Sequence, residues 1–191
     1  MVHQELNQAL KRSVMDNIWL GRYPRIKLGG AKMPFVSDKA EYDMTMEVFK
    51  DLNFEKFGIN INPRTIMSTM PVSRRQMVEI AKAVSFNSKI IVLDEPTSFL
   101  DIKGKIELLT ILKELAHTGQ LAVILSLHEL ELAEKIADTV VCVSPGGVSG
   151  VLTPEQAFQP ENIRALYGLT EQQYTACLLY TSPSPRDKRQ S

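Results

Sequence analysis

Two adjacent carboxylic acids follow a short apolar segment near the middle of the chain. The segment Ile90–Leu93 is aliphatic, and Asp94 and Glu95 come directly after it. Such a segment predicts a strand buried on both faces, and ligands of parallel α/β sheets bind beyond the carboxyl ends of the strands. Asp94 could hold a phosphate-bound Mg²⁺, which prefers oxygen ligands, and Glu95 could polarise an attacking water. The two acids could equally end a strand in solvent without binding a ligand, and the acid pair alone does not distinguish these two interpretations.

Apolar segments that alternate with helical patterns surround the acid pair. Strands are predicted over residues 90–93, 121–125 and 139–143, the second also buried. Helices over residues 102–117 and 129–137 separate them. Single helices between strands indicate a largely parallel sheet with right-handed crossovers. The sequence therefore predicts an α/β core that places the acid pair at the edge of the sheet.

The part of the chain before this core is predicted to be helical. Helices are expected near residues 14–19, where Ser13 could cap the first turn, and over 39–52 and 73–85. Residues 21–36 contain several Gly and Pro residues and are expected to form a loop. In the core, the predicted helix 102–117 has one apolar side, formed by Ile106, Leu109, Leu112 and Leu115.

The composition is that of a globular domain. The 191 residues include 22 Lys or Arg and 22 Asp or Glu, and 44% of them are hydrophobic. A zero net charge argues against a nucleic-acid partner, because such proteins are usually basic. No apolar run approaches the ~20 residues that span a bilayer, so any membrane role is expected to come through a partner. Two cysteines exclude a disulfide framework, and the first residues do not resemble a signal peptide.

The wider sequence resembles the ATP-binding subunits of ABC transporters. Residues 94–97, Asp-Glu-Pro-Thr, match the Walker B end of that family, and residues 98–101 match its D-loop. His128 matches the switch histidine, and Gln4 matches the glutamine of the Q-loop. The resemblance covers about residues 1–169. It implies an α/β fold, the P-loop NTPase-type ABC cassette.

The resemblance also implies a role for each matched residue. Glu95 and His128 would be catalytic, the first by polarising water and the second by contacting the γ-phosphate. Mg²⁺ would be bound by Asp94 and Gln4. The further contacts to ATP would come from Gln4, Ser73 and Asp101.

The implied partners are those of an importer. A second ATP-binding cassette would close over ATP, permease membrane subunits would contact the Q-loop, and a solute-binding protein would take part indirectly. The location implied is peripheral, at the cytoplasmic face of the bacterial inner membrane.

Two kinds of importer are resembled in different parts of the chain. Residues 1–98, with Asn17–Gly21 and Gln76–Ala83, are similar to monosaccharide importers for galactose/methylgalactoside or ribose. Residues 99–169, with Ile124–Leu130, are similar to iron-siderophore and cobalamin importers instead. The leading hypothesis is a fragment of a sugar importer ATPase. The alternatives are a siderophore or cobalamin importer, a non-hydrolysing docking module, and a non-transport ABC ATPase, which would need a coiled-coil or basic surface that the sequence lacks.

The chain departs from the family pattern in its glycine loops. The phosphate-binding loop Gly-x-x-x-x-Gly-Lys-[Ser/Thr] is absent, because Gly104-Lys105 is followed by Ile106 and preceded by Phe99 at the first glycine position. We therefore expect an amino-truncated cassette with little or no ATPase activity of its own.

The signature loop also differs. Residues 70–74 stand where Leu-Ser-Gly-Gly-Gln is usual, and Pro71, which lacks an amide hydrogen, replaces the serine. Ser73 and the following helix start could still contact phosphate, so the site is expected to be weakened. Arg74 and Arg75 could form a phosphate clamp, or simply a solvated helix start.

The domain organisation follows from these comparisons. We expect a Q-loop and helical subdomain over 1–88, an α/β core over 89–169, and a disordered tail over 170–191. Residues 177–191 resemble a translated sequencing adaptor, although a natural Pro/Ser-rich tail has a similar composition. Residues 1–98 carry 14 basic and 11 acidic side chains, whereas residues 99–176 carry 5 basic and 10 acidic side chains. Together with the change of resemblance after residue 98, this indicates a join of two genes within Asp94–Ser98. The alternative is one divergent protein.

Overall fold

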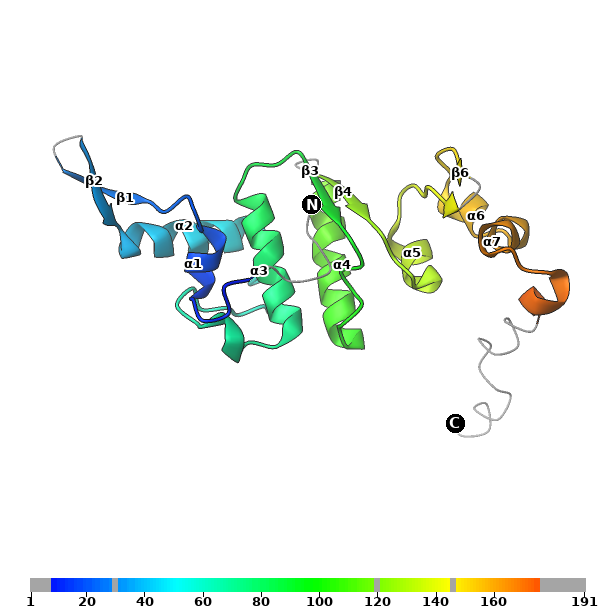
Figure 1. The fold of residues 1–191 in the computed structure, drawn as a ribbon, viewed down its shortest axis with the longest axis horizontal. Helices are drawn as coiled ribbons and strands as arrows, with labels where there is room; N and C mark the ends of the chain where they lie inside the picture. The colour runs from blue at the N-terminus through cyan, green and yellow to red at the C-terminus, as the bar shows by residue number, and fades with distance from the viewer. Residues whose placement is uncertain (1–7, 29–30, 119–120, 145–146, 176–191) are drawn as a thin grey trace. The chain divides into compact units, whose positions relative to one another are not determined.

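A computed structural model describes residues 8–28, 31–118, 121–144 and 147–175 (Figure 1). The chain forms two compact units, Met1–His128 and Glu129–Ser191. The first unit contains the acid pair and His128. Contacts thus divide the chain after His128, and the boundaries expected at residues 88 and 169 stay predictions.

The first unit contains the expected helices, and local capping explains where they begin. These helices are α1 (Val14–Ile18), α2 (Asp38–Asp51), α3 (Val72–Val84) and α4 (Ile102–His117). A short 3-10 turn that was not predicted, η1 (Met67–Thr69), precedes α3. Ser13 and Asp16 form a capping box at α1, in which each side chain accepts from the other residue's amide. The Ser37 hydroxyl accepts from the Ala40 amide at the start of α2. Among the described residues, no helix has the length and apolar composition needed to cross a membrane.

The segment expected to be a loop forms a β-hairpin instead. Its strands are β1 (Arg25–Leu28) and β2 (Ala31–Val36), which pair antiparallel. Leu28 pairs with Ala31, so only two residues, both glycines in the sequence, lie between the strands. A Gly-Gly pair between apolar-containing segments is a hairpin signal, and the prediction of a loop was wrong because it treated these glycines only as breakers.

Strands β3 and β4 pair in parallel and lead to the acid pair. β3 spans Ile90–Leu93 and β4 spans Ala122–Leu125, in the register Ile90↔Ala122 through Leu93↔Leu125. Helix α4 connects them and packs on β4 (Figure 1). The predicted strand–helix–strand unit is confirmed.

The prediction that β3 and β4 are buried on both faces is wrong. Ile91 and Leu93 are buried in the core, but Ile90 is 59% exposed and Ile124 is 55% exposed. The helices of the described residues cover only one face of the strand pair. Ile106 is also exposed, because α4 turns Leu108, Ile111 and Leu112 inward instead.

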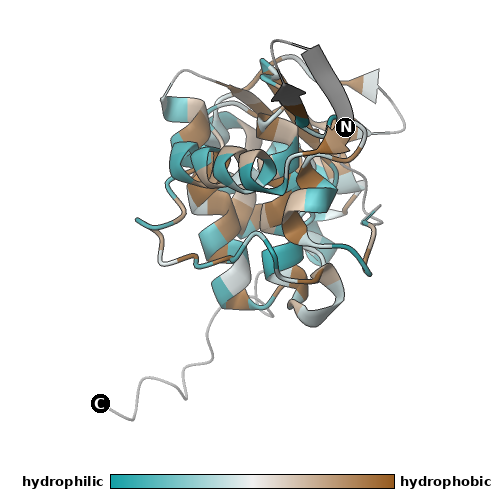
Figure 2. Ribbon diagram, turned by 90° about the vertical axis from the view of Figure 1, so that its left-hand side faces the viewer, coloured by the Kyte–Doolittle hydropathy of each residue, from teal (hydrophilic) through white to brown (hydrophobic). Residues whose placement is uncertain are grey.

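One hydrophobic core joins the helices to the strand pair. In Figure 2 the helices carry hydrophilic and hydrophobic residues on different sides, as expected for elements that bury one face. The largest fully buried apolar side chains are Ile18, Leu52, Met67, Met77, Ile80, Leu108, Ile111 and Leu112. These side chains come from α1, α3, α4 and the connecting segments. Ile91 and Leu93 of β3 belong to the same core, so the position of the strand pair depends on the packing of these helices.

Arg22 connects the end of α1 to the end of α3 through hydrogen bonds. Its guanidinium group donates to the Ile18 carbonyl (3.0 Å) and to the carbonyl and hydroxyl of Ser85 (3.0 and 2.8 Å). The same group lies 3.5 Å from the centre of the Phe86 ring and 5.1 Å from that of the Trp19 ring. Such stacking stabilises a partly desolvated arginine. Arg22 therefore restrains two helices that are distant in sequence.

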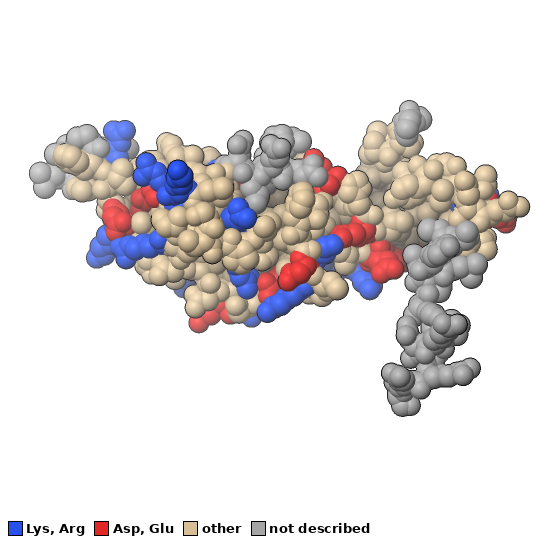
Figure 3. Space-filling view, turned by 60° about the horizontal axis from the view of Figure 1, so that its bottom comes forward, with Lys and Arg blue, Asp and Glu red and all other residues tan. Residues whose placement is uncertain are grey.

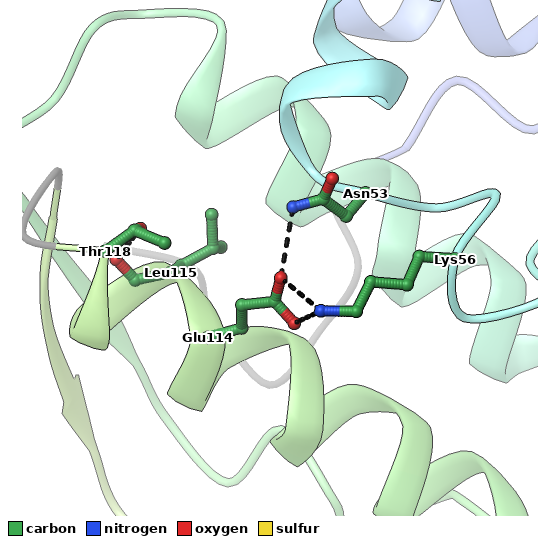
Figure 4. Close-up of polar contacts among 5 residues, drawn as sticks. All are labelled: Asn53, Lys56, Glu114, Leu115 and Thr118. Carbon is green, nitrogen blue, oxygen red and sulfur yellow. Dashed lines mark hydrogen bonds and ion pairs between the residues drawn. The ribbon is translucent and has the colours of Figure 1, made fainter.

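A polar contact holds the segment after α2 against α4 (Figure 4). Glu114 accepts from the Asn53 amide group (3.1 Å) and from the Lys56 ammonium group (2.9 Å to each oxygen). The Lys56 side chain is 63% exposed, so this ion pair contributes little to stability. On the face shown in Figure 3, basic and acidic side chains are interspersed.

The second unit is built from short elements. They are α5 (Leu130–Ile136), β5 (Val143–Ser144), β6 (Gly147–Val148), α6 (Pro154–Ala157) and α7 (Pro160–Tyr167). The predicted strand 139–143 is therefore wrong as a third parallel strand. Its end pairs antiparallel with β6, and Val140 forms an isolated antiparallel bridge with Leu152. Ser144 pairs with Gly147, so two residues, Pro145 and Gly146 in the sequence, lie between these strands.

The start of the predicted tail is ordered as a turn of helix. The Tyr174 amide donates to the Thr170 carbonyl (3.0 Å), and the Thr170 amide donates to the Gln173 side chain (2.9 Å). This differs from the disorder expected from residue 170. The rest of the tail, residues 176–191, lies outside the described residues, and its origin as an adaptor stays a prediction.

Glu41 is a carboxylic acid in the buried part of α2. The residue is 3% exposed, and its Oε1 atom is buried without a hydrogen-bond partner. Burial raises the pKa of Glu41 to about 7, and the charges of Asp16 and Asp38 act in the same direction. Glu41 therefore changes its protonation state near neutral pH.

We expect the substitution Glu41→Gln to stabilise the fold at high pH and to have little effect at low pH. Between pH 4.5, the ordinary pKa, and about pH 7, the folded state binds more protons than the unfolded state. The free energy of unfolding of the wild type therefore falls as pH rises through this window. Above it, the variant should be more stable by up to about 3 kcal/mol. Urea unfolding followed by circular dichroism from pH 4 to 8 measures this difference.

Glu47→Gln is the matched control, since Glu47 is exposed on the same helix. A stability difference between Glu41→Gln and wild type that does not vary with pH would contradict the expectation, as would the same pH dependence in the control.

Candidate active site

The acid pair lies where the carboxyl ends of β3 and β4 meet. Leu93 and Leu125 are paired at the ends of the two strands, so Asp94 and Glu95 leave the sheet beside the residues that follow β4. The Ser126 amide continues the ladder and donates to the Leu93 carbonyl (3.0 Å). The parallel register thus brings together two segments that are more than thirty residues apart.

A single hydroxyl group contacts both acidic residues. Ser126 Oγ donates to Asp94 Oδ1 (2.6 Å) and accepts from the Glu95 amide (2.9 Å). Asp94 is exposed and Glu95 is half-buried. Sequence reasoning missed Ser126. Aligning the two apolar segments at their last residues, Leu93 and Leu125, would have placed it opposite Asp94.

Glu95 has an unusual backbone conformation and contacts His128. Its φ of 44° lies in the left-handed region, which is uncommon for a residue with a side chain. One carboxylate oxygen, Oε1, contacts His128 Nε2 in a close pair, and Oε2 accepts from the Ser98 hydroxyl (3.0 Å). The structure therefore brings Glu95 and His128 into contact, with Asp94 next to Glu95 in the chain, and the roles expected of these residues stay predictions.

The segment after the acid pair is anchored by burial and by a helix cap. Thr97 and Leu100 are buried, and the Leu100 amide donates to the Thr97 carbonyl (3.1 Å). Asp101 is the N-cap of α4, and its Oδ1 accepts from the Gly104 amide (2.8 Å). Phe99, between these anchors, is 66% exposed.

Ser73 and Asp101 form a second group around Gly104. A β-carbon added to Gly104 would lie 2.9 Å from Asp101 Oδ1 and 3.0 Å from Ser73 Cβ. The first turns of α3 and α4 therefore approach closely, and only glycine fits between them. Ser73 and Asp101, predicted as ATP contacts, are thus neighbours.

The start of α3 has no side-chain cap. Pro71 occupies the N-cap position and makes no side-chain hydrogen bond there. Arg74 pairs with Glu107 of α4 (2.9 Å), and both side chains are about one fifth exposed. This ion pair favours neither of the two alternatives considered for the arginines, because Arg74 binds a neighbouring helix.

The chemistry of the acid pair fits a metal bound together with phosphate. Mg²⁺ is usually held by one or two carboxylates, while phosphate and water supply its other ligands. Asp94 offers an exposed oxygen ligand beyond the strand end. Among the described residues no group of three or more acidic, His or Cys side chains could hold a metal ion by itself. Gln4, the other predicted metal and ATP contact, lies outside the described residues.

The fold is that of an ATP-binding cassette of an ABC transporter. A metal-chelate type ABC transporter in an inward-facing conformation matches 85% of this chain and 61% of its own, with a TM-score of 0.67 and 23% identity. A dimeric ATP-binding cassette bound to ADP and Pi matches 80% of this chain and 61% of its own, with a TM-score of 0.59 and 20% identity. At identities this low the two matches concern the fold alone, and they confirm the predicted fold class.

Sequence relatives of the chain carry the description of sugar import proteins. The galactose/methyl galactoside import ATP-binding protein of Clostridium perfringens is 49% identical over 146 residues, which are 76% of this chain and 26% of the relative. The Escherichia coli protein of the same description is 44% identical, with the same coverage. That of Treponema pallidum is 43% identical over 157 residues, 82% of this chain and 28% of the relative. No family model matches the chain.

The chain is therefore a homologue of the galactose/methyl galactoside import ATP-binding proteins, and it spans about a quarter of their length. The matched 146 residues are more than residues 1–98 contain, so the match continues past Ser98. The join expected within Asp94–Ser98 stays a prediction.

We expect Gly104→Ala to destabilise the fold. Alanine favours a helix interior over glycine by about 1 kcal/mol, but its methyl group would press on Asp101 and Ser73. Overpacking of this kind costs about 1–3 kcal/mol. A net decrease in the free energy of unfolding would therefore show that the steric clash exceeds the gain in helix propensity. Urea unfolding measures it.

Gly150→Ala is the control, since a β-carbon at Gly150 would meet no atom within 4 Å. A Gly104→Ala variant that is more stable than the wild type would contradict the close approach of α3 and α4, because the gain in helix propensity would then be unopposed.

Proposed function

We propose that this chain is part of the ATP-hydrolysing subunit of an ABC importer for a monosaccharide. The contact between Glu95 and His128 at the joined ends of β3 and β4 is the observation that carries the proposal. The Glu95 carboxylate, the His128 ring and the neighbouring Asp94 thus lie at the carboxyl ends of parallel strands, where α/β proteins bind ligands. The relatives at 43–49% identity are named for galactose and methyl galactoside import.

Asp94 and Gln4 would hold Mg²⁺ on the phosphates of ATP. When bound, the ion would neutralise negative charge on those phosphates. Asp94 is suited to this because it is exposed and because Ser126 orients its carboxylate.

Glu95 and His128 would act on the water that attacks ATP. Glu95 would accept a hydrogen bond from the water and direct its oxygen at the γ-phosphorus. As the new bond forms, the bond between the γ-phosphorus and the bridging oxygen of ADP would break, ADP would leave with that oxygen, and Glu95 would take up the proton lost by the water. His128 would contact the γ-phosphate and, through its contact with Glu95, restrict the carboxylate to one orientation.

Ser73 and Asp101 would act across a pair of cassettes. Their shared position at Gly104 ties the start of α3 to the start of α4, so both would move together when a second cassette closes over ATP. The further partners would be permease membrane subunits and, indirectly, a solute-binding protein. The working location would be peripheral, at the cytoplasmic face of the bacterial inner membrane.

The 191-residue chain by itself is expected to show little or no ATP turnover. Its sequence has no Gly-x-x-x-x-Gly-Lys-[Ser/Thr] loop, whose amides and lysine bind the β- and γ-phosphates. Turnover by the purified chain that disappears in Glu95→Gln would contradict this expectation.

The proposed function is tested by exchanging segments with a relative. Residues 8–175 would replace the matching segment of the Escherichia coli galactose/methyl galactoside import ATP-binding protein, and ATP hydrolysis and galactose uptake would be measured with its permease. We expect both to be retained. Glu95→Gln in this hybrid should lower turnover by about 10²–10⁴-fold, because a general base contributes roughly that much, and should leave ATP binding intact.

The exposed Glu47→Gln serves as the control, since Glu47 lies on α2 and not at the carboxyl ends of β3 and β4. A hybrid that folds and joins the permease but neither binds nor hydrolyses ATP would contradict the proposal. A hybrid that hydrolyses ATP without galactose uptake would contradict its sugar part.

A further inference from the structure

We propose that Ser126 is a positioning residue that sets the orientation of both acids of the site, an inference that rests on the proposed function. Ser126 comes directly after β4 and lies beside the end of β3. Its hydroxyl group contacts both the Asp94 carboxylate and the backbone of Glu95.

The hydrogen-bonding capacity of a hydroxyl group matches these two contacts. A serine hydroxyl has one hydrogen to donate and two lone pairs that accept. Ser126 Oγ donates that hydrogen to Asp94 Oδ1 and accepts the amide hydrogen of Glu95. Its backbone is fixed independently, since the Ser126 amide donates to the Leu93 carbonyl (3.0 Å). The backbone of Ser126 is therefore held beside the end of β3.

The contact to the Glu95 amide bears on the conformation of the catalytic acid. Glu95 has a φ of 44°, a conformation that costs free energy for any residue with a side chain. The hydrogen bond from its amide to Ser126 offsets part of that cost. In this conformation the Glu95 carboxylate reaches His128 and the Ser98 hydroxyl. Removing the Ser126 hydroxyl should therefore loosen the turn and with it the contact between Glu95 and His128.

The contact to Asp94 bears on metal binding. A charge-assisted hydrogen bond of 2.6 Å restricts rotation of the Asp94 carboxylate. Ser98 differs from Ser126 in this respect, because its hydroxyl contacts only the outer end of the Glu95 side chain among the contacts described. Ser126 thus links the side chain of the metal-binding acid to the backbone of the catalytic acid.

The test uses two substitutions of equal shape in the full 191-residue chain. Ser126→Thr keeps the hydroxyl group and Ser126→Val replaces it with a methyl group, and both side chains are β-branched and suit a strand end. Thr110→Val is the control, because it removes an exposed hydroxyl from α4 that contacts only its own helix, at the Ile106 carbonyl. Thermal unfolding identifies any variant that is not folded.

The first measurement is hydrogen exchange of the Glu95 amide by nuclear magnetic resonance. We expect exchange to be about tenfold faster in Ser126→Val than in the wild type, because the amide loses its acceptor. Ser126→Thr and Thr110→Val should remain close to the wild type. The Ser126 amide, which donates to Leu93, should stay protected in all four proteins.

The second measurement uses Mn²⁺·ATP as the probe, because Mn²⁺ broadens the signals of nearby nuclei even when binding is weak. In the wild type, broadening should centre on Asp94 and Glu95. Ser126→Val should raise the apparent Kd by roughly threefold to tenfold, the loss expected for one hydrogen bond, and Ser126→Thr should restore it.

The outcomes separate the two proposals. Equal Glu95 exchange or equal Mn²⁺·ATP affinity in the wild type and Ser126→Val would overturn the role of Ser126. The same effects in Thr110→Val would also overturn it. A hybrid that folds and joins the permease but does not hydrolyse ATP would instead overturn the proposed function, and the role of Ser126 in metal binding would fall with it.

Discussion

The parallel pairing of β3 with β4 determines where every polar group of the candidate site lies. Leu93 and Leu125 end the two strands in register, and the Ser126 amide extends the ladder by one hydrogen bond to Leu93. A slip of one residue would turn each side chain to the opposite face of the sheet. Asp94 would then lose Ser126, and Glu95 would no longer reach His128. The chemistry proposed here thus depends on a register that four residue pairs establish.

The helices maintain that register by burying one face of the strand pair. Ile91 and Leu93 join the core formed by α1, α3 and α4, while Ile90 and Ile124 remain exposed on the other face. The same helices carry the second group of candidate residues, because Gly104 lets α4 approach α3 at Ser73. Packing of the helical part and geometry of the site are therefore linked, and a change at Gly104 would affect both.

Local signals explain which elements could be predicted and which could not. The starts of α1, α2 and α4 depend on Ser13, Ser37 and Asp101, each of which caps an amide three residues later. Such information is contained in a few neighbouring residues, so the helices were predicted closely. The strand at residues 139–143 was assigned to the wrong kind of pairing, because an apolar segment does not specify its partner. Burial of Ile90, Ile106 and Ile124 was misjudged for the same reason, since it depends on which elements cover them.

The sequence by itself determined the residue types of the site, the strand–helix–strand unit that carries them, and the homology to sugar importer ATPases. Asp94 and Glu95 follow an apolar strand, and His128 follows the next one, which can be recognised without coordinates. Only the tertiary structure decided that Ser126 supports both acids, that Glu95 adopts a left-handed conformation, and that Ser73 and Asp101 meet at Gly104. These features depend on strand register and helix approach, which arise from contacts between residues distant in the sequence and therefore leave no local pattern.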